Sequence, residues 1–380
     1  MKKKIVFISE INAQSINTTS THILTENILY GLKKAGYYVT FLAICSTEDA
    51  FSNTEQHYRN LVDELYLVRS RFGGSNNKYK KLFDMVKGVF VSCPYKKILP
   101  KKLDLAENTV LVSHTPSYEA IFLCRELLKR CNSIKYIQYW SDPMALSGIM
   151  PEQFNYKRRP FYWLEKYAYK LASEIVFGTE PLYKMNSTLY PNYKSKMRYV
   201  DLAYLHNSDS ELDKNRNLFI YAGNYYKAIR NIQPLYEAFS ELTSNCQLDI
   251  YGRGDLELKP TENIRIHSRI SPDELAKIEN SYQNTLVLLN QGCMQIPGKT
   301  FYRMNTNQNI LVIADGSHRE ELKTYLSRYN RFLICNNDKD DIKVAVQELM
   351  KSGPFHCSNE FLRLLSPEYV SSKIIEGDML

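Results

Sequence analysis

A proline, a glycine and a lysine stand between two apolar runs in the second half of the chain. The runs read TLVLL and ILVIA, and the triplet is Pro297-Gly298-Lys299. Unbroken β-branched runs around a helical segment are typical of a parallel sheet, so the triplet should open a helix after a strand. The N–H groups and dipole of a helix start favour an anion, and a lysine beside them favours phosphate. We therefore expect Gly298, Lys299 and Thr300 to bind a phosphate, which is a first indication of a nucleotide ligand.

The stretch from residue 285 to residue 316 also carries a family resemblance. It resembles the donor-site segment of retaining glycosyltransferases with the GT-B fold (glycosyl transferases group 1, family 4-like), in the bacterial surface-polysaccharide branch. There a strand ending in an Asn-containing loop leads into a P-x-K-x-F-E-Y helix and a strand that ends in Asp-Gly, matched here by Asp315-Gly316. The resemblance implies an α/β fold of two tandem Rossmann-like domains facing a central cleft.

A second motif follows the run FIYA. Gly223 and Asn224 end this expected strand, and Lys227 and Arg230 precede a helix containing E-A-F. The segment resembles the family's "G-R … K-G/N … E-A-F" element, whose basic residues neutralise the donor diphosphate where negative charge develops. The resemblance assigns Arg230 to the diphosphate, although an exposed cation at a helix start is the alternative. Asn224 replaces the family's first basic residue, and Lys227 can substitute for it.

Candidates for the nucleoside lie further along the chain. Gly252 and Gly254 resemble the family's G-x-G turn, and Arg269 falls where the family holds the base. The alternative for the glycines is a tight turn without a ligand. Ser271-Pro272 is equally well explained as a helix N-cap with a first-turn proline.

The chain departs from the family at two positions. Many relatives carry two glutamates eight positions apart, where this chain has Met294 and Tyr302. A tyrosine hydroxyl can bind a ribose, but without the assistance of charge. This departure keeps open a noncatalytic GT-B subunit that scaffolds a polysaccharide assembly complex. A nucleotide-sugar 2-epimerase of related fold is a further alternative.

In the first half of the chain, His114 and Asp142 each follow an expected strand. They resemble the family's strand-end histidine and its "D-P/D-x-W" element, which implies catalytic roles on the acceptor side. A structural histidine and a turn-forming aspartate before proline are the alternatives. Glu165 resembles a scaffold position of the family, and Glu180 is a weaker site candidate.

The first loop and the possible metal ligands give weaker indications of function. The loop from residue 10 to 21 lacks the family's glycines, so its hydroxyl residues would contact phosphate or face the acceptor; these are Ser15, Thr18, Thr19 and Ser20. Asp338-Lys339-Asp340 has the D-x-D form of metal-dependent transferases, but we interpret it as a helix start. We expect neither a metal nor a cofactor.

The 380 residues suit two domains. Alternating strand and helix patterns predict an acceptor-side domain over residues 1–205, a polar linker over 206–217 and a nucleotide-sugar domain over 218–358. Residues 359–380 should form a C-terminal helix that crosses back to the first domain.

The net charge of +8 is concentrated in one stretch. Residues 69–102 hold ten Lys or Arg against one acid, Asp84, a net charge of +9 with interleaved aromatic residues. This stretch is either a solvated insertion or a contact with an anionic membrane. No nucleic-acid-binding motif is present.

The remaining features indicate the compartment. No apolar run approaches the roughly 20 residues that span a bilayer, and we interpret the lysine-rich start as a first strand. Eight scattered cysteines without a C-x-x-C pair indicate reduced thiols. We therefore expect a cytoplasmic protein, peripheral at the inner face of the plasma membrane.

The sequence thus predicts a metal-independent glycosyltransferase. It would move a sugar, with retention, from a nucleotide-diphosphate donor to a glycan acceptor, with UDP favoured over GDP. The acceptor would be a lipid-linked intermediate of capsule, O-antigen or exopolysaccharide.

Overall fold

The computed structural model describes residues 3–11, 20–70, 89, 103–106, 108–115, 117–146, 155–206, 215–242, 245–352 and 355–377. Outside these ranges lie Ser15, Thr18 and Thr19 of the first loop, most of the predicted linker and most of the basic stretch 69–102, whereas Ser20 is the first residue of a helix. The chain divides into two compact units, which are Met1–Ala145 with Arg159–Leu202 and Ser366–Leu380, and Leu146–Arg158 with Ala203–Leu365.

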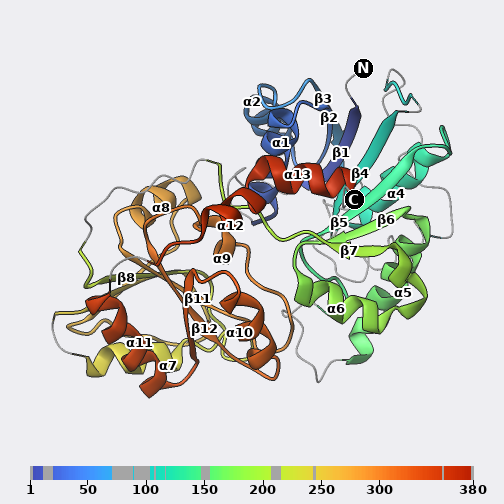
Figure 1. Cartoon of the computed structure of the whole chain (residues 1–380). Helices are drawn as coiled ribbons and strands as arrows, with labels where there is room; N and C mark the ends of the chain where they lie inside the picture. Colours follow the sequence, from blue (N-terminus) through green and yellow to red (C-terminus); the bar gives the residue numbers. More distant parts are fainter. Residues whose placement is uncertain are drawn as a thin grey trace. The chain divides into compact units, whose positions relative to one another are not determined.

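The first unit is an α/β sandwich around a parallel sheet (Figure 1). In its described residues the sheet has seven strands in the order β3-β2-β1-β4-β5-β6-β7. Their bounds are β1 Lys4–Ile11, β2 Tyr38–Cys45, β3 Glu64–Arg69, β4 Thr109–Thr115, β5 Lys135–Trp140, β6 Glu174–Phe177 and β7 Met197–Tyr199. The central strands are buried on both faces, which explains why they read as continuous apolar runs.

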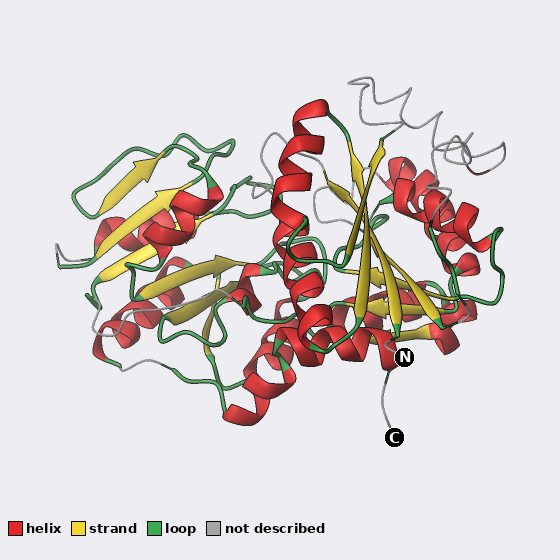
Figure 2. Ribbon diagram, turned by 90° about the horizontal axis from the view of Figure 1, so that it is seen from above, coloured by secondary structure: helices red, strands yellow, loops and turns green. Residues whose placement is uncertain are grey.

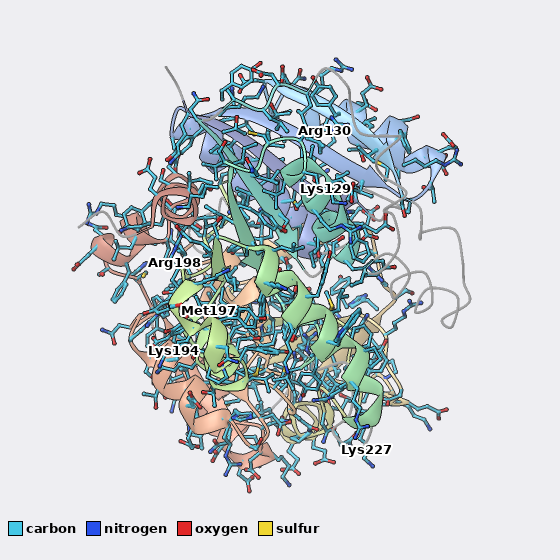
Figure 3. All side chains as sticks on the ribbon, turned by 90° about the vertical axis from the view of Figure 1, so that its right-hand side faces the viewer. Lys129, Arg130, Lys194, Met197, Arg198 and Lys227 are labelled. Carbon is cyan, nitrogen blue, oxygen red and sulfur yellow. The ribbon has the colours of Figure 1, made fainter. Side chains whose placement is uncertain are left out.

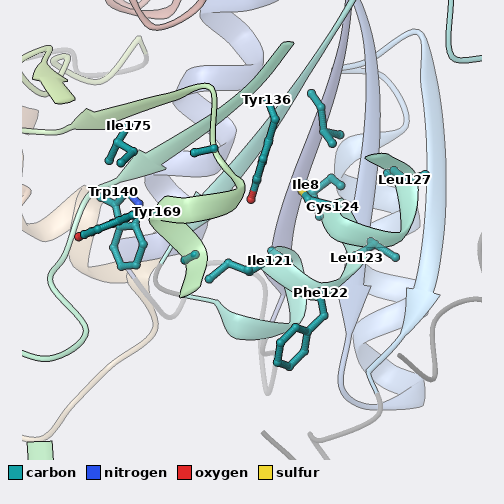
Figure 4. Packing of buried hydrophobic residues seen from close by; sticks show 14 of the residues in the cluster. Ile8, Ile121, Phe122, Leu123, Cys124, Leu127, Tyr136, Trp140, Tyr169 and Ile175 are labelled. Atoms are coloured by element: carbon teal, nitrogen blue, oxygen red, sulfur yellow. The ribbon is translucent and has the colours of Figure 1, made fainter. Parts of the chain in front are cut away.

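Helices cover this sheet and close its core. They are α1 Ser20–Lys34, α2 Glu48–Tyr58, α4 Tyr118–Leu128, α5 Asn155–Leu171 and α6 Glu180–Leu189, followed by the 3₁₀ helix Pro191–Lys196. Figure 4 shows the core on one face of the sheet, where Ile121, Phe122 and Leu123 of α4 pack with Tyr136 and Trp140 of β5. Ser117 begins α4 by accepting a hydrogen bond from the Ala120 N–H, as expected for an N-cap.

The second unit repeats the plan of a sheet covered by helices (Figure 2). In its described part the sheet has six strands in the order β10-β9-β8-β11-β12-β13. The strands are β8 Leu218–Ala222, β9 Gln247–Tyr251, β10 Ile264–His267, β11 Asn284–Leu288, β12 Asn309–Ala314 and β13 Phe332–Asn336. The helices are α7 Gln233–Glu241, α8 Pro272–Glu279, α9 Lys299–Tyr302, α10 Arg319–Ser327, α11 Lys339–Lys351 and α12 Asn359–Leu364. Asp338 caps α11 through the Asp340 and Asp341 N–H groups, which confirms the helix-start interpretation of the D-x-D segment.

Both strand orders reverse direction once. The first sheet grows from β1 to β2 and β3, and then restarts on the other side of β1 with β4; the second does the same at β8 and β11. Doubly wound sheets bind their ligands outside the carboxyl ends of the strands at such switch points. The fold therefore predicts ligand sites at the loops that follow β1, β4, β8 and β11. Within the described residues, no helix combines the length and apolarity needed to cross a bilayer.

The prediction of one C-terminal helix over residues 359–380 is wrong. The segment forms two helices, α12 and α13 (Pro367–Glu376), separated at Leu365 and Ser366. Pro367 has no N–H with which to continue α12, and the Ser366 hydroxyl caps the new helix by accepting from the Tyr369 N–H. The break assigns α12 to the second unit and α13 to the first.

Helix α13 packs closely on α1. The Ser371 hydroxyl donates to the Ile28 carbonyl at 3.1 Å, and the Arg198 guanidinium donates to the carbonyls of Lys373 and Ile374 at the end of α13. A Cβ on Gly31 would lie 2.1 Å from the Pro367 carbonyl oxygen. Close approach of the two helices therefore requires glycine at position 31.

Gly31→Ala should lower the free energy of unfolding by about 1–3 kcal/mol, because the added methyl group overpacks the α1–α13 contact. This loss opposes the gain of about 1 kcal/mol that alanine normally brings inside a helix. Urea denaturation measures the difference. Gly292→Ala is the matched control, since a Cβ there meets nothing within 4 Å; equal stability of both variants would contradict the packing argument.

Candidate functional site

The loops after β8 and β11 meet at the switch point of the second sheet. Arg230, in the loop after β8, donates through Nε to Asn290 Oδ1 at 2.6 Å. Asn290 follows β11 and is buried, and its amide also donates to Gln295 Oε1 at 3.3 Å. The guanidinium is therefore fixed at the carboxyl edge of the sheet, where this topology places ligands.

Lys299 begins α9, and its side chain returns to the end of β8. Its Nζ donates to the carbonyl oxygen of Ala222 at 2.5 Å and lies 4.8 Å from the ring centre of Tyr221. A Cβ on Gly223, the next residue, would lie 3.2 Å from the same Nζ. The structure thus brings together Lys299 and Gly223, two of the residues predicted to contact the diphosphate.

Helix α9 contributes less than the sequence suggests. Gly298 is its N-cap as predicted, but the helix has only four residues. One turn holds few aligned peptide dipoles, so the anion site predicted at the helix start loses most of its dipolar attraction. Thr300 is fully buried, and its hydroxyl has no hydrogen-bond partner within the described residues. The positive charge at this edge comes from side chains.

Among the described residues, Lys299 and Arg230 have no counter-ion. Burial, followed by the Arg230 guanidinium, lowers the pKa of Lys299 to about 7, although the Glu279 carboxylate acts in the opposite direction. Glu279 itself pairs with Arg303 at 2.8 Å. In the described part of the chain, no carboxylate forms an ion pair with Lys299 or Arg230. Neighbouring cations without compensation favour a bound anion with more than one negative charge.

Gly252 and Gly254 allow the loop after β9 to pack on the loop after β8. A Cβ on Gly252 would lie 2.1 Å from the Gly223 carbonyl oxygen, and one on Gly254 would lie 1.7 Å from the Tyr225 carbonyl oxygen. These approaches fix the loop after β9 against the loop after β8. The close packing accounts for both glycines, and their contact with a nucleoside stays a prediction.

The other polar candidates of this unit lie around these loops. Lys227 is exposed, and its backbone N–H donates to Asp255 Oδ1 at 2.9 Å. The Asn224 carbonyl accepts from the Tyr221 hydroxyl at 3.2 Å. Arg269 is exposed between β10 and α8, and Ser271 forms the predicted N-cap of α8.

Met294 and Tyr302, which replace the family's glutamates, are both buried. The Tyr302 hydroxyl lies against the start of α9, because a Cβ on Gly298 would lie 2.6 Å from it. Tyr302 is therefore close to Lys299 in the structure as well as in the sequence. Its contact with a ribose stays a prediction.

Asp315 joins three loops in a way that the sequence analysis missed. Its Oδ2 accepts from Gln291 Nε2 at 2.9 Å and from Asn337 Nδ2 at 2.7 Å. Asn337 also donates to the Asn231 carbonyl at 2.9 Å. Gly316 has φ 76°, and a Cβ there would lie 1.9 Å from the Gln291 carbonyl oxygen. The Asp-Gly motif is visible in the sequence. The hydrogen-bond partners of Asp315, however, lie far from it along the chain, and no local sequence pattern identifies them.

His114 lies in a buried hydrogen-bond chain of the first unit. Its Nδ1 is 2.9 Å from Thr25 Oγ1, and its Nε2 is 3.0 Å from Ser141 Oγ, which donates to Asp142 Oδ2 at 3.2 Å. Burial, followed by the nearby His22, lowers the pKa of His114 to about 3, so the ring is neutral at neutral pH. In this arrangement His114 is connected to Asp142 through the Ser141 hydroxyl. The catalytic roles of His114 and Asp142 stay predictions.

Glu165 fixes the loop that carries Asp142. Its Oε1 accepts from the N–H groups of Met144 and Ala145, both at 2.9 Å, and Oε2 accepts from the Tyr190 hydroxyl. Burial raises the pKa of this carboxyl despite the three donors. These contacts agree with the scaffold interpretation of Glu165. Glu180, the weaker candidate, pairs with Lys184 at 2.9 Å.

Comparison with known proteins supports the fold. No protein-family model matches the chain, and no curated protein matches its sequence. Among solved structures, TarM of S. aureus in complex with UDP superposes with a TM-score of 0.61 at 10% identity, over 99% of this chain and 97% of TarM. Sucrose-phosphate synthase of Thermosynechococcus elongatus gives 0.58 at 10%, over 98% and 94%.

A third structure extends this group. UDP-GlcNAc 2-epimerase of Neisseria meningitidis, bound to UDP-GlcNAc, gives a TM-score of 0.55 at 10% identity, over 98% of both chains. These neighbours and the two doubly wound sheets confirm the predicted fold class. The chain has the GT-B fold. At such identities the likeness establishes the fold alone.

Binding of a nucleoside diphosphate such as UDP should take up a proton at about pH 8, because a bound anion raises the pKa of Lys299 from about 7. The affinity should then fall by about tenfold per pH unit above 7. Isothermal titration in buffers of different ionisation enthalpy measures both effects. Lys299→Arg keeps its charge throughout and should show neither effect; the same proton uptake in this variant would contradict the assignment.

Proposed function

We propose that the protein is a glycosyltransferase that moves a sugar from a nucleotide-diphosphate donor to a glycan acceptor. The observation that carries this proposal is the pair of uncompensated cations, Lys299 and Arg230, at the switch point of the second sheet. In a donor of this kind, bond cleavage puts an additional negative charge on the diphosphate. Fixed cations beside that charge stabilise the transition state more than the ground state.

The proposed chemistry is displacement on the face of the sugar that the diphosphate leaves, with retention of configuration. The acceptor oxygen forms the new bond to the anomeric carbon as the bond to the diphosphate breaks. The acceptor's proton passes to a departing phosphate oxygen, so no protein nucleophile is needed. Lys299 and Arg230 supply the charge that a metal provides in other transferases. We assign acceptor contacts in the first unit to Asp142, held by Ser141 and His114.

We propose UDP as the nucleotide and a lipid-linked glycan as the acceptor, with the protein at the cytoplasmic face of the membrane. UDP is favoured because structures related in fold, TarM of S. aureus and MnaA of S. aureus, contain it. Arg269, Gly252 and Gly254 are the proposed nucleoside contacts, together with the Tyr302 hydroxyl. The sugar, linkage and acceptor require experiment.

A 2-epimerase is the second candidate, because UDP-GlcNAc 2-epimerases of Listeria monocytogenes and Neisseria meningitidis share the fold. An epimerase changes the configuration of its nucleotide sugar without any acceptor. NMR of UDP-GlcNAc incubated with the protein alone separates the two activities. A new sugar configuration without acceptor favours the epimerase, whereas UDP release that depends on acceptor favours the transferase.

A noncatalytic scaffold is the third candidate, since Met294 and Tyr302 replace the glutamates of many relatives. The cation pair opposes this candidate, because a scaffold does not need two half-buried positive charges that lack a counter-ion among the described residues. Turnover of any nucleotide sugar that is lost in Lys299→Ala would exclude the scaffold.

A panel of nucleotides tests the donor class. We expect UDP to raise the melting temperature more than GDP, dTDP, CDP or CMP, each at millimolar concentration. A ligand at 100 times its dissociation constant stabilises the native state by about 2.7 kcal/mol. Lys299→Ala should lose the response to UDP, and Lys351→Ala, at an exposed position in the same unit, should keep it. No response of the folded wild type to any nucleoside diphosphate would contradict the proposal.

A further inference from the structure

The outward side of α5 carries cations and a tryptophan in one line. Arg159, Trp163, Lys166 and Lys170 are spaced by four, three and four residues, which places them on one side of the helix. The three cations are exposed and Trp163 is half-buried. Leu164, on the opposite side of α5, is fully buried in the core, so this line faces away from the core.

The end of α4 continues the same surface. Arg125 of α4 donates through Nη1 to the Tyr167 hydroxyl of α5 at 2.8 Å, which joins the two helices. Lys129 and Arg130 follow α4 and are exposed. Figure 3 views the molecule from this side, with Lys129 and Arg130 labelled. We call Lys129, Arg130, Arg159, Trp163, Lys166 and Lys170 the α5 surface.

In the described residues of α4, the turn after it and α5, no acidic side chain is exposed, so no exposed acid offsets the positive charge. The acidic residues of these elements are Glu119, Glu126 and Glu165, with exposed fractions of 1%, 5% and 1%. Glu126 forms ion pairs with Arg125 and Lys129. Glu165 accepts a hydrogen bond from the loop after β5. The formal charge that reaches solvent here is therefore carried by lysine and arginine.

Aromatic side chains add a second property to the α5 surface. The Trp163 ring stacks on that of Tyr167, with centroids 6.4 Å apart and planes 25° apart. Tryptophan and tyrosine are enriched at membrane–water interfaces, because one part of each ring system is apolar and another forms hydrogen bonds. An inorganic polyanion in solution attracts the cations alone, whereas a bilayer surface also accommodates the aromatic rings.

One described residue of the basic stretch, Val89, lies beside α4. Val89 is the one described residue between positions 71 and 102, and it packs against the core of the first unit. The Val89 carbonyl accepts from Arg125 Nη1 at 3.2 Å. Val89 therefore lies beside α4, and the sequence around it, residues 69–102, has a net charge of the same sign as the α5 surface.

We propose that the α5 surface docks on an anionic lipid bilayer. Lysine and arginine near an anionic leaflet each strengthen binding several-fold, and Trp163 would lie at the level of the headgroups. The docking extends the proposed function, because it brings the first unit to the surface that holds a lipid-linked acceptor. The purpose of the docking rests on the proposed function, whereas the surface charge and the Trp163–Tyr167 pair are observed independently of that function.

Vesicle sedimentation of the full chain tests the docking. We expect the protein to bind vesicles of phosphatidylcholine with about 30% phosphatidylglycerol at about 0.1 M salt, and to be released at about 0.5 M. The triple variant Arg159→Gln/Lys166→Gln/Lys170→Gln should lose at least about tenfold in partitioning. Trp163→Ala should weaken binding with its salt dependence retained. The control Lys259→Gln/Lys351→Gln/Arg363→Gln removes three exposed cations of the second unit and should bind as the wild type does.

Circular dichroism and the melting temperature show whether each variant is folded, and the thermal response to UDP reports the donor site separately. A triple variant that responds to UDP but leaves the vesicles supports the docking. Equal binding of the wild type to pure phosphatidylcholine vesicles, or equal losses in the two triple variants, would overturn it. So would tight binding to inorganic polyphosphate without binding to the anionic vesicles.

Discussion

Two neighbouring positive charges at the edge of the second sheet have no negative partner among the residues that the structure describes, and the proposed donor site depends on them. Lys299 reaches the last carbonyl of β8, Arg230 is oriented by Asn290 after β11, and Glu279 is already paired with Arg303. Such an arrangement costs free energy in the empty protein, as the lowered pKa of Lys299 shows. A doubly charged anion that bound there would recover this free energy, which is why we propose the edge as a binding site.

The loops around these charges are built to keep them in place. Asp315 ties the loops after β11 and β13 together through side chains, and Asn337 extends the connection to the loop after β8. Gly252 and Gly254 let the loop after β9 lie against the same backbone. Rigid support of this kind reduces the reorganisation needed at the moment of reaction, which is the main source of electrostatic catalysis.

The sequence predicted what periodicity and local chemistry determine. Apolar runs predicted most strands, and Pro297-Gly298-Lys299 predicted where Lys299 enters its helix. The Ser366-Pro367 pair is a local signal for a new helix start, but the helical pattern that continues on both sides of the pair hides it. The bonds of Asp315 and the depressed pKa of Lys299 depend on residues brought together by the tertiary structure, so no local pattern announced them. The α5 surface likewise required burial, because only the structure shows that Glu165 is hidden.

The most direct test of the cation pair compares the affinities of UDP and uridine by isothermal titration. The account predicts that Lys299→Met/Arg230→Gln reduces the ratio of the two affinities by at least about a hundredfold, since two charge-assisted contacts to the diphosphate are lost. The affinity for uridine itself should change little, because neither side chain is assigned to the nucleoside. An unchanged ratio in a folded double variant would show that the diphosphate binds elsewhere and would contradict the account.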